Sequence, residues 1–258
     1  MNDPSTGLVI VTGAGTGLGR AMAIELVARG RRVAGFGRRP EALAETARLA
    51  GAGFEACTVD VADADAVNAA IDRLLLDGPP LSVLINNAAV YPRRDFLDDT
   101  PQGFMHTVAI NLGGTVHCTH AALRHMVKSG RGRILNVSTF ADLAPLPASS
   151  AYAVSKGAGR IFTRALRADI ADRFPDIVVN DWMPGMLATD MGIAEGLRPE
   201  TAAKWGVALA LSNDPSLSGT LWERDTELLP PQSLKARLKN RLLMRSQKPR
   251  RLGDMGFS

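Results

Sequence analysis

A glycine-rich segment near the start of the chain restricts the fold more than any other part of the sequence. Residues 7–12 form an apolar run, and apolar residues return at helical spacing from Ala21 to Val27. A strand, a glycine turn and a helix in this order make an anion site, because backbone without Cβ atoms can approach a phosphate and the helix N-terminus offers unpaired N–H groups. The segment predicts a dinucleotide-binding unit; the alternative is a tight turn without a ligand. The residues expected to contact the cofactor are Gly13, Gly15, Thr16, Gly17, Leu18 and Gly19.

The rest of the chain alternates strand-like apolar runs with helical segments. This alternation predicts an α/β fold of the Rossmann type, a doubly wound parallel sheet with helices on both faces. A length of 258 residues suits one core, so we expect a single domain over residues 1–230 and a separate tail over residues 231–258. The helices are expected at residues 20–29, 41–49, 65–76, 104–127, 150–174 and 200–211.

The turn after the second expected strand indicates which of the two nicotinamide cofactors, NAD or NADP(H), the chain would bind. Arg38 and Arg39 follow the run at residues 32–36, where an acidic residue would bind the ribose 2′-hydroxyl of NAD. Guanidinium groups form charge-assisted hydrogen bonds with phosphate oxygens, so this pair suits the 2′-phosphate of NADP(H). The alternative is a solvated basic turn before a helix.

Tyr152 and Lys156 form the candidate catalytic pair. Residues four apart lie on one face of a helix, so the Lys156 ammonium can sit beside the Tyr152 phenol. A free phenol has a pKa of about 10, and a nearby positive charge favours the phenolate. The pair therefore suits proton transfer near neutral pH.

Taken in order, these motifs resemble the short-chain dehydrogenase/reductase family in its shorter single-domain form, from about Gly7 to Thr189. The resemblance implies an NADP(H)-dependent oxidoreductase that interconverts a carbonyl and an alcohol. Two rival functions are a non-catalytic NADP-sensing domain on the same fold and a reductase targeted by its tail to membrane or nucleic acid. The motifs are Thr12-Gly13-x-x-x-Gly17-x-Gly19, Asp60-Val61, Asn86-Asn87-Ala88-Ala89, Asn111, Tyr152 with Lys156, and Pro184-Gly185-Met186-Leu187-Ala188-Thr189.

The resemblance also implies roles for individual residues. Tyr152 would give a proton to the substrate oxygen, Lys156 would lower the Tyr152 pKa and hold the nicotinamide ribose, and Asn111 would anchor a water of the proton relay. The catalytic serine of the family falls at Thr139 by register, and Ser138 is the alternative. The further implied cofactor contacts are Asp60 and Val61 at the adenine, Asn87 and Ala88 after the fourth strand, and Pro184, Gly185, Leu187 and Thr189 at the carboxamide.

The C-terminal tail departs from the family pattern and carries the excess positive charge. Residues 231–258 hold eight of the thirty basic residues and one of the twenty-six acidic ones, so the remaining chain has 22 basic against 25 acidic side chains. Leu234, Leu238 and Leu242 predict an amphipathic basic helix. We expect it to pack on its own body or on a second subunit of a homo-oligomer, a dimer or tetramer, while membrane and nucleic acid are not favoured.

Several other features indicate an ordinary cytoplasmic enzyme. The first six residues lack a basic signal-like start, and the apolar runs are too short to span a bilayer. Cys57 and Cys118 are expected to be buried and reduced. His117 and His120 lie three apart on an expected helix without further ligands, so no metal site is predicted, and the expected partner is a small-molecule carbonyl or alcohol.

Overall fold

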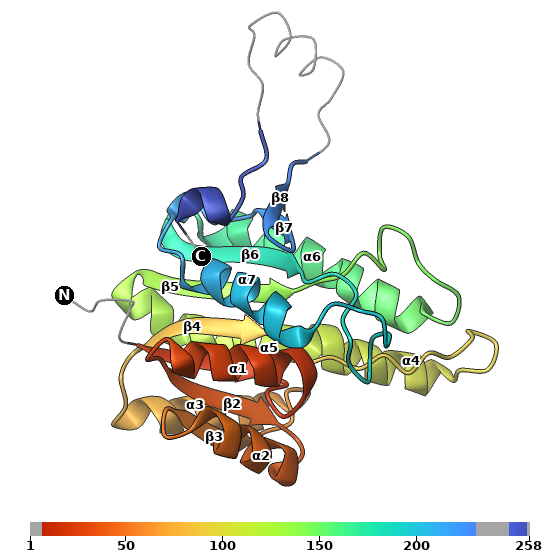
Figure 1. The fold of residues 1–258 in the computed structure, drawn as a ribbon, viewed down its shortest axis with the longest axis horizontal. Helices are drawn as coiled ribbons and strands as arrows, with labels where there is room; N and C mark the ends of the chain where they lie inside the picture. The colour runs from red at the N-terminus through yellow and green to blue at the C-terminus, as the bar shows by residue number, and fades with distance from the viewer. Residues whose placement is uncertain (1–6, 231–247, 257–258) are drawn as a thin grey trace, which may run out of the picture.

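The computed structural model describes residues 7–230 and 248–256 and has one mixed sheet between two layers of helices (Figure 1). The strand order is β3-β2-β1-β4-β5-β6-β7-β8, and every neighbouring pair is parallel except β7 and β8. The doubly wound α/β fold expected from the sequence is therefore confirmed. The strands are β1 Leu8–Thr12, β2 Arg32–Gly37, β3 Phe54–Thr58, β4 Leu81–Asn86, β5 Arg131–Val137, β6 Asp176–Met183, β7 Leu221–Glu223 and β8 Thr226–Leu228.

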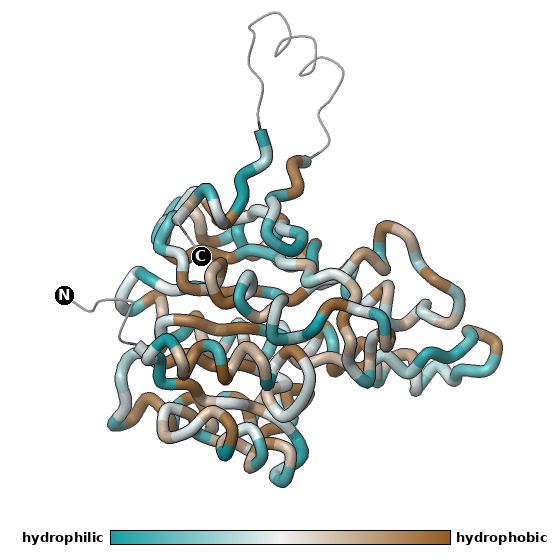
Figure 2. Tube along the Cα trace, in the orientation of Figure 1, coloured by the Kyte–Doolittle hydropathy of each residue, from teal (hydrophilic) through white to brown (hydrophobic). Residues whose placement is uncertain are grey.

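Alternate residues of the central strands feed two hydrophobic cores. On β1, Val9 and Val11 pack in the core under α1, α2 and α7, whereas Leu8 and Ile10 pack in the core under α3, α5 and α6. Figure 1 shows α1 and α7 in front of the sheet and α5 behind it, and Figure 2 shows the brown apolar strands between them. The helices are α1 Gly17–Ala28, α2 Pro40–Ala50, α3 Ala64–Leu76, α4 Pro101–Val108, α5 Gly114–Ser129, α6 Ser150–Ile170 and α7 Pro199–Leu211.

The expected helix over residues 104–127 is interrupted in the structure. It begins earlier, at Pro101, because the Thr100 side chain caps it by accepting from Gly103 N. Residues Ala109–Gly113 then form a single π-helical turn between α4 and α5. Such turns insert a residue into a helix and occur frequently at functional sites.

One edge of the sheet is a hairpin that was not expected from the sequence. Strand β7 pairs with β6, turns at Arg224 and returns as the antiparallel β8. Residues 248–256 then lie against β8, with an isolated bridge between Thr226 and Arg251 and with Leu252 buried in the core. The predicted amphipathic helix around Leu234, Leu238 and Leu242 falls outside the described residues.

Both cysteines are buried free thiols, as the sequence suggested. Cys57 on β3 is 4% exposed and Cys118 on α5 is fully buried, and both belong to the core under α3, α5 and α6. Burial raises the pKa of Cys57 to about 11 and that of Cys118 to about 12.

Candidate active site

Parallel strands bring the expected site residues to one edge of the sheet. Strands β1 to β7 run in the same direction, so the residues that follow their carboxyl ends gather there, and the chain order reverses between β1 and β4. Crevices at such switch points are where ligands bind in doubly wound sheets. The residues that follow these strand ends are Gly13 after β1, Arg38 after β2, Asp60 after β3, Asn87 after β4, Ser138 and Thr139 after β5, and Pro184 after β6.

The glycine turn has the backbone of an open phosphate cradle. Gly13 and Gly17 adopt positive φ angles of 68° and 52°. A Cβ atom on Gly19 would lie 2.1 Å from the carbonyl oxygen of Gly13, so only glycine fits there. Thr16, the N-cap of α1, has an exposed extended backbone and makes no side-chain cap hydrogen bond. The first N–H groups of α1 therefore remain free to bind an anion.

Thr12 joins the glycine turn to the end of β4. Its hydroxyl accepts hydrogen bonds from the backbone N–H groups of Asn87 and Ala88, both at 2.9 Å. The Asn87 amide in turn donates to the Thr12 carbonyl at 2.9 Å. These bonds hold the two halves of the switch point together and fix Asn87 and Ala88 beside Gly13.

Two residues that the motifs did not single out shape the other side of the turn. The Arg20 guanidinium donates to the Gly15 carbonyl at 2.6 Å and to the Thr46 hydroxyl at 3.1 Å. Thr46, fully buried on α2, donates to the Ala14 carbonyl at 2.9 Å. A sequence signal for Arg20 is its position directly after Gly19, although one of its partners, Thr46, lies on another helix.

Arg38 and Arg39 are exposed beside this turn. Both follow β2, and Arg39 is the N-cap of α2, whose Ala42 lies against Gly15. Within residues 7–230 and 248–256, neither guanidinium has a hydrogen-bond or ion-pair partner. Both side chains are therefore free to reach a phosphate at the adenosine end of the crevice.

The remaining expected cofactor residues line the two ends of the same edge. Asp60 is exposed and its carboxylate accepts from Ala62 N at 3.0 Å. Val61 is buried, and its carbonyl oxygen lies within hydrogen-bond distance, 3.0 Å, of the Nδ1 atom of His117. At the other end, Pro184 and Leu187 are buried, and Gly185 has a φ of 87°. Thr189 lies close to α1, because a Cβ on Gly17 would be 3.2 Å from its methyl group.

Tyr152 and Thr139 meet at the end of β5. Burial raises the pKa of Tyr152, and a hydrogen bond with the Thr139 side chain opposes that rise. The Thr139 hydroxyl also accepts from Ala141 N at 3.3 Å. Ser138 is buried, its N–H donates to Trp182 O at 2.7 Å, and its hydroxyl has no partner among the described residues. Thr139 is therefore the hydroxyl that contacts the phenol.

Lys156 lies one helical turn from Tyr152 and is buried. Its ammonium donates to the carbonyl of Val137 at 2.8 Å. Burial lowers its pKa to about 8, and the nearby carboxylate of Asp181 opposes this effect. In the structure the influence that lowers the Tyr152 pKa comes from Thr139, whereas the sequence analysis assigned it to Lys156.

Asn111 occupies the π-helical turn and is fully engaged. Its amide oxygen accepts from Val90 N at 2.8 Å, and its amide nitrogen donates to Val90 O and to the Ser155 hydroxyl, both at 3.0 Å. Its backbone carbonyl accepts from Thr115 at 2.9 Å and has a second lone pair. These bonds fix Asn111 between the segment at Val90 and helix α6.

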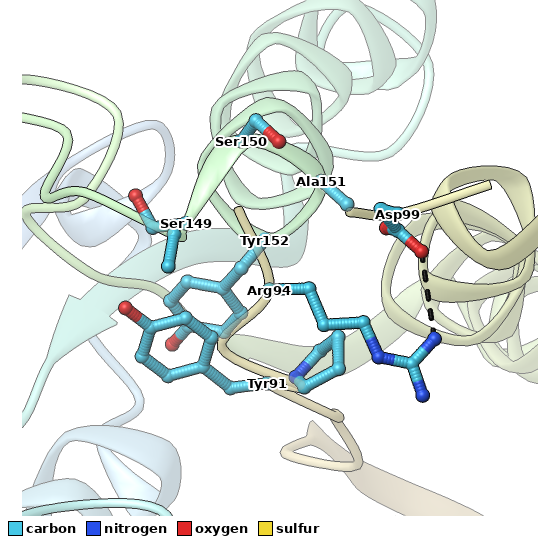
Figure 3. A pocket seen from close by; sticks show the side chains of 9 residues that line it. Tyr91, Arg94, Asp99, Ser149, Ser150, Ala151 and Tyr152 are labelled. Carbon is cyan, nitrogen blue, oxygen red and sulfur yellow. Dashed lines mark hydrogen bonds and ion pairs between the residues drawn. The ribbon is translucent and has the colours of Figure 1, made fainter. Parts of the chain in front are cut away.

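A second tyrosine, Tyr91, covers the ring of Tyr152. The two rings are stacked, with centroids 4.4 Å apart and planes 21° apart. Figure 3 shows both phenol oxygens pointing to the same side of the stack. The sequence analysis missed Tyr91; its signal is that the chain has only two tyrosines and that both lie in segments of the predicted site. The small pocket beside the stack is lined by Tyr91, Pro92, Arg94, Asp99, Ala148, Ser149, Ser150, Ala151 and Tyr152.

A chain of polar side chains crosses the core behind the catalytic edge. Asn86 on β4 donates to Thr119 at 2.9 Å and to Asn136 at 2.8 Å. Asn136 donates to Thr163 at 2.9 Å, and Thr163 donates to Asp181 on β6 at 2.9 Å. Burial raises the pKa of Asp181 to about 7, against lowering by Thr163, Arg160, Arg164 and Lys156. The sequence gave no indication that this acid is buried.

The described residues offer neither a metal-binding cluster nor a membrane-spanning helix. No cluster of three or more His, Cys, Asp or Glu side chains is arranged to bind a metal ion in residues 7–230 and 248–256. Over the same residues, no helix has both the length and the apolar character needed to cross a membrane.

Comparisons with known proteins indicate the family of this chain. A family model described as short chain dehydrogenase matches residues 7–198. The chain is 37% identical over 191 residues to 2-(R)-hydroxypropyl-CoM dehydrogenase of Xanthobacter autotrophicus, covering 71% of this chain and 76% of the relative. It is 35% identical over 199 residues to galactitol 2-dehydrogenase (L-tagatose-forming) of Cereibacter sphaeroides, covering 76% and 77%. A solved structure described as a short chain dehydrogenase/reductase family protein aligns with a TM-score of 0.76 at 27% identity, covering 84% of this chain and 94% of that one.

Proposed function

Because this chain belongs to the short-chain dehydrogenase family, we propose that it is an NADP(H)-dependent oxidoreductase that interconverts a carbonyl compound and an alcohol. The observation that carries the proposal is the contact between Tyr152 and Thr139, one helical turn from Lys156 and at the same sheet edge as the glycine turn. A phenol and a second hydroxyl that meet at this edge can both hydrogen-bond one substrate oxygen.

The residues at this edge fit the dinucleotide. The open backbone of Gly13, Gly17 and Gly19 and the uncapped start of α1 suit a pyrophosphate, and the free guanidinium groups of Arg38 and Arg39 suit a 2′-phosphate. Asp60, Val61, Asn87 and Ala88 would line the adenosine side. Pro184, Gly185, Leu187 and Thr189 would line the nicotinamide side. When bound, NADPH supplies the hydride for reduction.

Proton donation falls to Tyr152. Since burial raises its pKa, the phenol keeps its proton at neutral pH and can give it to the oxygen of a carbonyl that is being reduced. Thr139 holds that oxygen by a hydrogen bond. Lys156 places a cation behind the phenol, and the carbonyl of Asn111 holds a water from which the proton is replaced.

The substitution Tyr152→Phe tests the assignment. It removes only the hydroxyl, so NADPH should still bind while turnover falls by about 10²–10⁴-fold, the usual contribution of a general acid. NADPH binding is measured by fluorescence and turnover by NADPH oxidation, after a screen of ketones, aldehydes, quinones and acyl-thioester ketones. A variant that keeps more than about a tenth of the wild-type rate, with chemistry rate-limiting, removes Tyr152 from this role. A wild type that binds NADPH but oxidises it with no carbonyl favours the non-catalytic sensor.

The choice of cofactor is tested at Arg38. A hydrogen bond to a charged group contributes about 1.5–3 kcal/mol, so the wild type should prefer NADPH to NADH by about one to two decades in Kd. Arg38→Asp should abolish that preference, because it removes the cation and repels the 2′-phosphate. Isothermal titration with each cofactor measures the ratio. Equal affinities in the wild type would mean that Arg38 and Arg39 form only a solvated turn.

A further inference from the structure

A third residue, Arg93, lies against the stack of Tyr91 on Tyr152. Its guanidinium carbon lies 5.3 Å from the centre of the Tyr91 ring, on a ring that already faces Tyr152. Arg93 also has a φ of 48°, a left-handed conformation that is strained for a residue with a side chain. Strain of this kind persists where surrounding contacts hold it, and often at functional sites.

The contacts that hold Arg93 come from the loop between β6 and α7. Its Nη2 atom donates to the carbonyl of Met191 at 2.9 Å and to that of Gly192 at 2.7 Å, almost one hundred residues further along the chain. These carbonyls belong to a tight turn, because Gly192 N donates to Thr189 O at 2.9 Å and a Cβ on Gly192 would lie 1.8 Å from Leu187 O. Arg93 therefore holds a turn whose backbone has little freedom.

The same turn reaches the expected cofactor site. Thr189, at its start, lies against Gly17 at the beginning of α1, and Leu187 is buried beside it. A continuous series of contacts thus runs from the phosphate turn through Thr189 and Gly192 to Arg93, and from Arg93 through Tyr91 to Tyr152. None of these residues except Tyr152 is needed to transfer a proton.

We propose that Tyr91 and Arg93 are positioning residues. Arg93 fixes the loop after β6, and Tyr91 holds the ring of Tyr152. Together they keep the phenol in a defined place relative to the cofactor side of the site. The proposal rests on the proposed function, because it assigns a position to the proton donor. Tyr91 also shields one face of the phenol from water, so a substrate reaches Tyr152 at its hydroxyl edge.

The small number of tyrosines allows a test that needs no substrate. In Tyr91→Phe and in Tyr91→Ala, Tyr152 is the only tyrosine left, so the appearance of phenolate absorbance, or ¹³C NMR of labelled tyrosine, reports its pKa alone. Phe keeps the stacked ring and Ala removes it. Since burial is the largest cause of the raised pKa, Tyr152 should titrate at a lower pH in Tyr91→Ala than in Tyr91→Phe. Equal midpoints would overturn the stacking role.

Kinetics test the part played by Arg93. Arg93→Met keeps the apolar stem and loses the donors, and it should lower kcat/KM by about tenfold, a loss typical of a misplaced catalytic group. Arg93→Lys, which can still donate to one carbonyl, should recover part of that loss. Arg124→Met is the matched control, because Arg124 is exposed on α5 and pairs with Asp72 away from this edge. Circular dichroism and melting of each variant confirm that it is folded.

The outcomes separate this inference from the proposed function. If Tyr152→Phe is inactive while Tyr91→Ala and Arg93→Met keep the wild-type kcat, KM and pH profile, the positioning role is wrong and the catalytic assignment stands. If Tyr152→Phe keeps its turnover, the proposed function fails, and the tyrosine titration still decides whether Tyr91 shields Tyr152. In reduction, activity is lost as pH rises through the Tyr152 pKa, so Tyr91→Ala should lose activity at a lower pH than Tyr91→Phe.

Discussion

The two hydroxyl residues that end β5 are neighbours in sequence but have different surroundings. The Thr139 side chain bonds with Tyr152, whereas the Ser138 hydroxyl is buried without a partner among the described residues. The order of the motifs did not decide which of the two corresponds to the catalytic serine of the family, because one inserted loop residue would shift the register from Thr139 to Ser138. Which of the two hydroxyls contacts Tyr152 depends on the path of the loop between β5 and α6. No local sequence pattern encodes that path.

Single substitutions should separate these two hydroxyls. Thr139→Val keeps the shape of the side chain and removes its hydroxyl, and we expect kcat to fall by about tenfold or more, since a hydrogen bond to the developing oxyanion is lost. Ser138→Ala should change kcat less, because that hydroxyl does not touch Tyr152. Steady-state NADPH oxidation measures both. A larger effect at Ser138 would reverse the assignment.

Other residues of the site show the limit of inference from sequence at this scale. Tyr152 and Lys156 were predictable because their spacing alone places them on one face of a helix. Tyr91 and Asp181 were not, since their roles depend on long-range contacts: the Tyr91 stack joins residues in two loops, and Asp181 meets Thr163 across two elements. A buried Asp is especially hard to predict, because the buried positions of a strand are normally apolar.

At the scale of elements, the long helix before β5 shows what periodicity cannot reveal. The sequence predicted one helix over residues 104–127, and its existence is confirmed, but the π-helical turn at Ala109–Gly113 was missed. The segment contains Gly113 and Gly114, which have no side chains and so give no periodic signal. The inserted residue places the Asn111 amide against Val90 and Ser155. The resemblance to the family pointed to Asn111 without indicating the turn that positions it.

The contact between β6 and α6 makes stability depend on pH. The pKa of Asp181 is about 7 in the folded protein and about 4 in an unfolded chain. The folded state therefore binds a proton that the unfolded state has lost, and this group should lower stability as pH rises from about 5 to 7. At about 1.4 kcal/mol per pKa unit, the change is about 2–3 kcal/mol. Lys156, whose pKa is about 8, stays protonated through most of this window.

Asp181→Asn tests this dependence. The amide can still accept from Thr163 and carries no charge, so the variant should gain stability relative to the wild type as pH rises from 5 to 7. Thermal or urea unfolding at several pH values measures the difference. Asp176→Asn is the matched control, because Asp176 is exposed at the start of the same strand. A constant difference between wild type and Asp181→Asn would show that Asp181 does not titrate in this window.

At the scale of the whole molecule, one arginine makes the charged contacts between residues 248–256 and the sheet edge. The Arg250 guanidinium donates to Glu227 at 2.7 and 3.0 Å and to the Ser216 hydroxyl at 2.7 Å, and its backbone carbonyl accepts from Glu227 N at 2.9 Å. Glu227 is buried, so its carboxylate depends on this partner. The predicted packing of the helix around Leu234, Leu238 and Leu242 falls outside the described residues. Residues 248–256 lie against β8, a strand that the sequence analysis did not expect.

Breaking this ion pair should loosen the end of the chain. Arg250→Ala leaves the buried Glu227 carboxylate unpaired, and we expect a loss of about 1–3 kcal/mol in the free energy of unfolding. Glu227→Gln with Arg250→Ala should lose less than the sum of the two single variants, as expected for a direct contact. Denaturant unfolding of the four proteins measures the coupling. Additive effects would mean that the pair contributes nothing beyond each residue alone.

Because both cysteines are buried, the rate at which their thiols react can measure local unfolding of the protein. A thiol reacts with a disulfide reagent only as an exposed thiolate, and Cys57 and Cys118 lie in one core with their pKa values raised to about 11 and about 12. Their labelling should therefore wait for the layer of α3, α5 and α6 to separate from the sheet. The modification rate of each native thiol, followed by mass spectrometry, would give the free energy of that local opening without an engineered cysteine.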